Sequence, residues 1–100
     1  MRIPESHSDI IEDKTRAVLS TVNKNSEIHS AFCFIRNIDD DIFIDIIDKE
    51  QIRHINTNNK VSILNNDPDN VARWFCIQGK IVSYVNNSKT VKITKVIIFP

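Results

Sequence analysis

The sequence predicts a mainly β protein, a small barrel of six antiparallel strands with short helices. Runs of β-branched and aromatic residues alternate with polar residues, as in strands that bury one face, and clusters of turn residues separate them. The chain contains no internal repeat and no low-complexity tract. Short strands in this order favour an antiparallel barrel over a sandwich or a parallel sheet.

The first elements expected are a short helix and a strand. Ser6 is a candidate capping hydroxyl with Asp9 three residues later, a pattern that predicts a helix start at Ser6. The two isoleucines that follow continue this helix. Residues 16–22 alternate as a strand does, with the odd-numbered side chains on one face.

The second expected strand, residues 27–36, is apolar on both faces at its centre. Phe32 and Phe34 point to one side, and a cysteine and an isoleucine point to the other. The barrel interior can cover only one of these faces, so a helix or a partner chain must cover the other. A polar turn then leads to a third strand over residues 42–47.

A second helix follows the third strand. Asp48 has the pattern of an N-cap, with Gln51 three residues on. Ile52 and Ile55 would give this helix one apolar stripe. A fourth strand is expected over residues 60–64.

The last two strands are expected over residues 73–85 and 90–99. Gly79, the one glycine of the chain, lies inside the first of them. Glycine within a strand marks a bulge, a bend or a close approach by another group. In the final strand the apolar parity switches at about Thr94 and Lys95, which predicts a β-bulge or a bend.

Composition limits the size and the partners of the protein. With 41% hydrophobic residues, the chain can build one core, so we expect a single domain over residues 1–100. The 13 basic and 13 acidic residues cancel. No overall field attracts nucleic acid or an anionic membrane, which disfavours a non-specific polyanion binder.

The cysteines and the search for targeting segments indicate the cellular compartment of the protein. Cys33 and Cys76 lie among apolar neighbours without the close spacing of a zinc or redox pair, so we expect buried, reduced thiols. The histidines likewise lack a second ligand at metal-binding spacing. No apolar run approaches the roughly 20 residues of a membrane span, and no signal-peptide segment is recognised. These observations favour a cytoplasmic protein.

Several segments, in this order, resemble the flavin-binding split β-barrels that are similar to pyridoxamine 5'-phosphate oxidase and include many deazaflavin-dependent reductases. The resemblance covers residues 3–85. It is carried by Thr15-Arg16-Ala17-Val18-Leu19-Ser20-Thr21, Arg53-His54-Ile55, Asp67-Pro68-Asp69-Asn70 and Arg73-Trp74-Phe75-Cys76-Ile77-Gln78-Gly79-Lys80. It implies a homodimer with FMN or a deazaflavin in a groove at the subunit interface.

The same resemblance implies where a cofactor phosphate would bind. In the family, a hydroxyl residue ends the third strand, and an arginine and a lysine begin the next helix. The matching positions here are Asp45, Lys49 and Gln51, so only Lys49 keeps the chemical character. Acidic charge at Asp45 and Asp48 opposes a phosphate at this helix start, and Asp48 reads better as a cap of the helix itself.

Three further residues complete the candidate cofactor-binding set. Arg53 and His54 lie close enough to the helix start to compensate for the lost phosphate contacts, and Trp74 offers a stacking surface. For each of them an ordinary role in packing or solvation is an open alternative. No catalytic acid, nucleophile or metal ligand is identified.

The sequence therefore supports two functions. The first is a flavin- or deazaflavin-dependent oxidoreductase, in which the cofactor supplies the chemistry. The second is a non-enzymatic split-barrel homodimer, with a degenerate cofactor groove, that acts as an interaction module. A third reading, binding of single-stranded nucleic acid through Phe32, Phe34 and Trp74, is disfavoured because no basic groove accompanies these aromatic residues.

Overall fold

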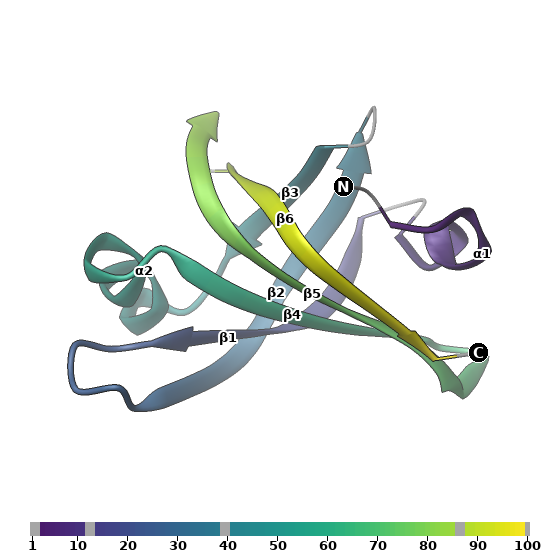
Figure 1. The fold of residues 1–100 in the computed structure, drawn as a ribbon, viewed down its shortest axis with the longest axis horizontal. Helices are drawn as coiled ribbons and strands as arrows, with labels where there is room; N and C mark the ends of the chain where they lie inside the picture. The colour runs from purple at the N-terminus through teal and green to yellow at the C-terminus, as the bar shows by residue number, and fades with distance from the viewer. Residues whose placement is uncertain (1–2, 12–13, 39–40, 86–87, 100) are drawn as a thin grey trace.

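The computed structural model describes residues 3–11, 14–38, 41–85 and 88–99 and forms a closed six-stranded barrel (Figure 1). All neighbouring strands are antiparallel, and their order around the barrel is β1-β2-β3-β6-β5-β4. The elements are α1 (Glu5–Ser8), the 3₁₀ helix η1 (Asp9–Ile11), β1 (Thr15–Val22), β2 (Ile28–Ile38), β3 (Asp41–Ile46), α2 (Lys49–Thr57), β4 (Lys60–Asp67), β5 (Asn70–Val85) and β6 (Ser88–Phe99). The predicted antiparallel barrel is confirmed.

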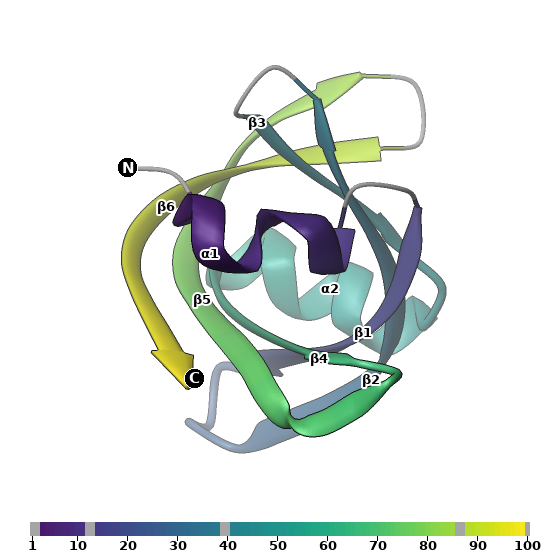
Figure 2. The same cartoon turned by 90° about the vertical axis from the view of Figure 1, so that its right-hand side faces the viewer.

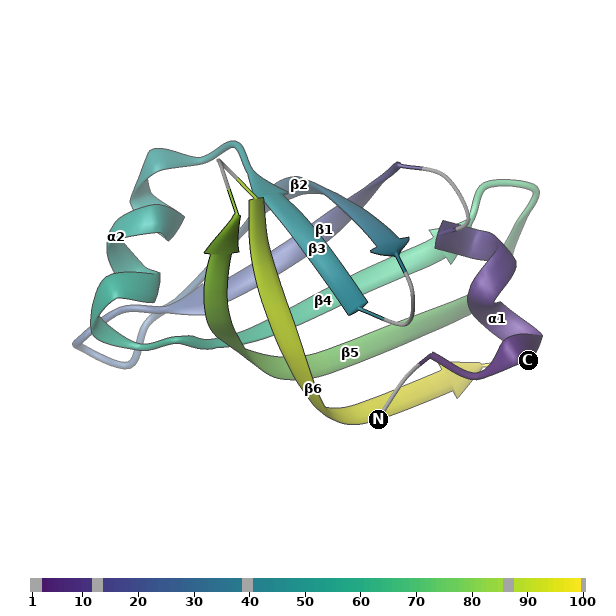
Figure 3. The same ribbon diagram turned by 90° about the horizontal axis from the view of Figure 1, so that it is seen from above.

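The core fills the barrel interior along the predicted strand faces. The odd-numbered residues of β1 from Ala17 to Thr21 are buried, as are Cys33 and Ile35 of β2, whereas Phe32 is 55% exposed. Cys33 is a free thiol, and its burial raises its pKa to about 12. The helices lie at opposite ends of the barrel, which Figures 2 and 3 show from two further sides. In the described part of the chain, no helix has the length and apolarity needed to span a membrane.

The predicted bulge in the last strand is present. Gln78 pairs with Lys95 and Gly79 pairs with Ile93, so Thr94 is the extra residue of β6. The Thr94 hydroxyl donates to the carbonyl of Gln78 over 3.1 Å. This bulge explains why the buried parity of β6 changes after Ile93.

Two expectations about the helices are wrong. The N-terminal helix begins at Glu5 after Pro4, and no side chain caps it. The Ser6 hydroxyl instead lies 2.8 Å from Nδ1 of His7. In α2, Ile55 is buried as predicted, but its buried companion is Gln51, whereas Ile52 is 37% exposed.

Arg73 at the start of the expected fifth strand fastens the N-terminal segment to the barrel. Its guanidinium donates to both carboxylate oxygens of Asp9, to the carbonyl of Ser6, and to Asp67 at 3.0 Å. The hydrogen bond from Arg73 lowers the pKa of Asp9. These bonds tie α1 and η1 to β4 and β5.

Candidate cofactor groove

Strand register arranges the outward side chains of the barrel in rows that run across the strands. Ser30 of β2, Ser20 of β1 and Ser62 of β4 are direct cross-strand partners and form the serine row. The hydroxyls of Ser20 and Ser30 are 2.8 Å apart. Gln78 of β5 lies opposite Ser62 and extends this polar line.

A different row lies on each side of the serine row. Two residues away along each strand is the apolar row, made of Phe32, Val18, Leu64, Cys76 and Ile97. Two residues away in the other direction is the lysine row, in which Lys60 pairs with Lys80 and Lys80 pairs with Lys92. Leu64 is 45% exposed and Ile97 is 38% exposed, so the apolar row faces outward.

A groove of about 500 Å³ lies where the serine row crosses β1, β4 and β5. Serines are short, so a depression forms beside the bulkier side chains of the lysine row. Its lining residues are Ser20, Val22, Ile28, Lys60, Val61, Ser62, Gln78, Gly79, Lys80 and Thr94. The groove thus combines the apolar residues Val22 and Ile28, the hydroxyl residues Ser20, Ser62 and Thr94, and two lysines.

The N-terminus of α2 is satisfied by its own cap. The carboxylate of Asp48 accepts from the backbone N–H groups of Glu50 at 2.8 Å and Gln51 at 3.4 Å, as predicted for an N-cap. Nε2 of His29 lies 3.2 Å from the other carboxylate oxygen. The hydrogen bond from His29 and those from the backbone lower the pKa of Asp48, although partial desolvation opposes them. A carboxylate therefore occupies the place where this helix end would hold an anion.

Gln51 is a structural residue of the protein interior. Its side chain is fully buried, and its amide donates to the carbonyls of Leu19 at 2.7 Å and His29 at 3.2 Å. Gln51 therefore ties α2 to β1 and β2. Asp45, also among the predicted site residues, is on β3 and forms an ion pair with Lys14 at 2.9 Å.

The other predicted site residues are dispersed. Lys49 is exposed at the start of α2, and Arg53 pairs with Glu50 at 2.7 Å. Nδ1 of His54 lies 3.0 Å from the Thr21 hydroxyl. Trp74 is on the outer face of β5 and stacks on Phe99 with ring centroids 5.5 Å apart.

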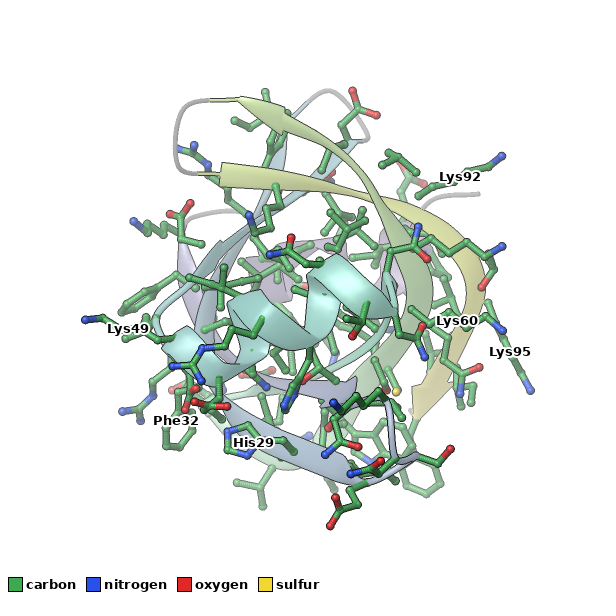
Figure 4. All side chains as sticks on the ribbon, turned by 90° about the vertical axis from the view of Figure 1, so that its left-hand side faces the viewer. His29, Phe32, Lys49, Lys60, Lys92 and Lys95 are labelled. Carbon is green, nitrogen blue, oxygen red and sulfur yellow. The ribbon has the colours of Figure 1, made fainter. Side chains whose placement is uncertain are left out.

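None of the predicted site residues lines the groove. Figure 4 shows Lys49 on one side of α2 and Lys60, Lys92 and Lys95 on the other. Trp74 is six residues from Lys80, which is about 20 Å along β5. Sequence reasoning missed the lining residues because the register of β1, β4 and β5 brings them together. Gly79, itself a lining residue, was the signal in the sequence that pointed to this part of β5.

The closed barrel with its helix between β3 and β4 has the split β-barrel fold of the proteins that are similar to pyridoxamine 5'-phosphate oxidase. No family model matches the sequence, and no curated protein matches it. The fold is therefore established by structural similarity.

Three solved structures illustrate the fold. An F420 reductase is 16% identical, with a TM-score of 0.79 over 94% of this chain and 98% of that one. An FMN-binding protein from Syntrophomonas wolfei is 17% identical, with a TM-score of 0.68 over 82% of this chain and 75% of that one. The heme storage protein HutZ from Vibrio cholerae is 10% identical, with a TM-score of 0.68 over 99% of this chain and 96% of that one. The fold thus occurs in proteins named for different cofactors.

Proposed function

We propose that this protein binds a flavin, either FMN or a deazaflavin such as F420, in the groove along the serine row. The groove carries the proposal: its volume of about 500 Å³ falls within the range of about 300 to 1,000 Å³ typical of small-molecule sites. The structural similarity to an F420 reductase and to an FMN-binding protein supports the same class of ligand.

The residues of the groove suit a planar ligand with polar edges. Val22 and Ile28 provide apolar contact, and the hydroxyls of Ser20 and Ser62 can each donate one hydrogen bond and accept others. A bound flavin supplies electron or hydride transfer itself, so the protein would need only to hold and orient it. An oxidoreductase of this kind requires no acid, base or nucleophile in the groove.

The lining favours flavin over heme. Heme iron is held by histidine, cysteine, methionine or tyrosine side chains. None of these is among the residues that line the groove. The similarity to a heme storage protein is therefore assigned to the fold alone.

We further propose that the protein acts as a homodimer. A second copy would cover the apolar row, together with Phe34, which is 36% exposed. Contiguous apolar side chains of this kind on a sheet face are typical of protein interfaces. Because the apolar row borders the serine row, this interface would place the groove next to the partner subunit.

The self-capped start of α2 supports the alternative, a non-enzymatic interaction module. Asp48 satisfies the helix N-terminus, and Asp45 adds a second carboxylate nearby in the sequence. In that case the apolar row would serve association, and the groove would have no cofactor.

Titration of the purified protein with FMN and with F420, followed by absorbance and fluorescence, tests the proposal. The variant Ser62→Phe should abolish binding because the new ring fills the groove. Ser30→Phe is the matched control, since Ser30 belongs to the same row but does not line the groove. Circular dichroism establishes that both variants are folded. If neither cofactor binds the wild type, the interaction module is the better conclusion.

A further inference from the structure

The lysine row is an uncompensated positive feature of the barrel surface. Lys60 and Lys80 face each other across β4 and β5, and Lys80 and Lys92 do so across β5 and β6. Like charges in direct cross-strand positions repel one another. Among the described residues, none of these three lysines forms an ion pair.

The charge distribution along the sequence strengthens this feature. Residues 70–100 contain five of the 13 basic residues and none of the 13 acidic ones. Strands β5 and β6 therefore offer no carboxylate to neutralise the row. A fourth lysine, Lys95 of β6, is the cross-strand partner of the groove residue Gln78. Figure 4 shows Lys60, Lys92 and Lys95 on the same side of the molecule.

The row also lies at the edge of the groove. Lys60 and Lys80 are lining residues, and the hydroxyls of Ser62 and Thr94 lie in the same groove. The Ser62 hydroxyl can donate to an anionic oxygen while it accepts from the Cys76 thiol, whereas the single proton of the Thr94 hydroxyl is already donated to the carbonyl of Gln78. Two cations and one hydroxyl donor therefore converge on one ligand-sized space.

We infer that the lysine row binds the anionic group of the ligand in the groove, with Lys60 and Lys80 as direct contacts and Lys92 and Lys95 adding long-range attraction. This inference rests on the proposed function for the identity of the ligand, a flavin whose side chain carries a phosphate. The inferred phosphate site is therefore the lysine row and not the N-terminus of α2, where Asp48 already caps the helix. The apolar contacts at Val22 and Ile28 would then receive the uncharged part of the ligand.

A comparison of FMN with riboflavin isolates the phosphate, because the two share the same ring. Wild-type protein should bind FMN at least tenfold more tightly than riboflavin. Lys60→Gln and Lys80→Gln should each remove most of this difference while leaving riboflavin affinity unchanged. Lys49→Gln is the matched control, because this exposed lysine begins α2 and does not line the groove. It should leave both affinities unchanged.

Loss of FMN affinity in Lys49→Gln but not in Lys80→Gln would overturn the inference, and so would equal affinities of wild type for FMN and riboflavin. A second measurement separates it from the proposed function. Inorganic pyrophosphate should shift the backbone amide NMR signals of Gln78 to Lys80 in the wild type, but not in Lys80→Gln. This shift in a protein that binds no flavin would refute the flavin proposal and retain the anion site. Absence of the shift together with absence of flavin binding would refute both.

Discussion

Gly79 and Lys92 approach so closely that no side chain fits between them. A Cβ atom at Gly79 would overlap the carbonyl oxygen of Lys92 and lie 2.8 Å from Cγ1 of Val91. The contact arises where the Thr94 bulge bends β6 over β5. The close approach inferred from this glycine is thus made by the backbone of a neighbouring strand.

Replacing this glycine should destabilise the barrel. Gly79→Ala forces β5 and β6 apart and should lower the free energy of unfolding by about 1 to 3 kcal/mol, as overpacking does. The melting temperature should fall by roughly 4 to 8 °C for each kcal/mol. Denaturant unfolding measures the change, and Gln78→Ala, an exposed neighbour on β5, should shift it by less than about 0.5 kcal/mol. Equal stabilities of Gly79→Ala and wild type would show that the two strands yield easily.

Gln51 should matter for stability. Gln51→Met removes the amide that donates to the carbonyls of Leu19 and His29 and so breaks the two hydrogen bonds that tie α2 to β1 and β2. The expected cost is about 1 to 3 kcal/mol in the free energy of unfolding. Arg53→Met on the exposed side of the same helix is the control and should cost less than about 0.5 kcal/mol. An unchanged Gln51→Met variant would mean that water replaces the lost donor.

Removing one charge from the lysine row should stabilise the ligand-free protein. Lys80→Gln relieves repulsion from both Lys60 and Lys92 and should raise the free energy of unfolding by about 0.2 to 1 kcal/mol. The gain should shrink as salt is added, because salt screens exposed charges. Thermal melts at low and high ionic strength measure it. A loss of stability at low salt would indicate that the Lys80 stem contributes packing that outweighs the repulsion.

The free energy of unfolding should depend on pH through Asp48. Its pKa in the folded protein lies below the ordinary value of 3.8, chiefly because His29 donates to it. Its charge therefore stabilises the fold above pH 3.8, and this contribution is lost as the pH falls through the lowered pKa. Asp48→Asn keeps a capping oxygen without the charge. Above pH 3.8 the wild type should have a larger free energy of unfolding than this variant, and the difference between the two should narrow as the pH falls below 3.8.

Urea unfolding at a series of pH values follows this difference between Asp48 and its variant. Asp69→Asn, in the exposed turn between β4 and β5, is the control and should show no such narrowing. A difference that stays constant through the acid range would mean that the cap, rather than the charge, provides the stabilisation.

The dimer proposal concerns the apolar row. Phe32→Glu places a charge at its exposed end, where the side chain is 55% accessible, so the monomer should stay folded while the dimer dissociates. Light scattering coupled to size-exclusion chromatography gives the mass. Lys24→Glu in the turn before β2 should leave the mass unchanged. A wild-type protein that is monomeric at high concentration would contradict the proposal.

The parts of the fold that depend on local alternation were predictable from sequence. The buried parity of β1 and the extra residue at Thr94 are examples, because both follow from which neighbours are apolar. The helix start at Ser6 was wrong, since Pro4 takes the N-cap position without a side-chain cap and Glu5 is the first helical residue. The groove could not be predicted, because the pairing of Ser20 with Ser62 depends on the register of two strands that are far apart in the sequence.

The uneven distribution of charge along the sequence was overlooked. No acidic residue follows Asp69, but the net charge of the whole chain does not reveal this. The predicted phosphate contacts followed the positions that the resemblance suggested at the start of α2. The lysine row is instead found from pairing, which aligns Lys60, Lys80 and Lys92 although they are far apart along the chain.

The parallel rows would separate the two proposed tasks of this surface, association and ligand binding. The apolar row and the lysine row lie four residues apart on β4 and on β5, which is about 13 Å, with the serine row between them. In the proposed arrangement, a substitution at Leu64 or Ile97 would alter association and leave the ligand contacts proposed for Lys60 and Lys80 intact. Variants of this barrel could then change the ligand or the subunit partner one row at a time, without rebuilding the other row.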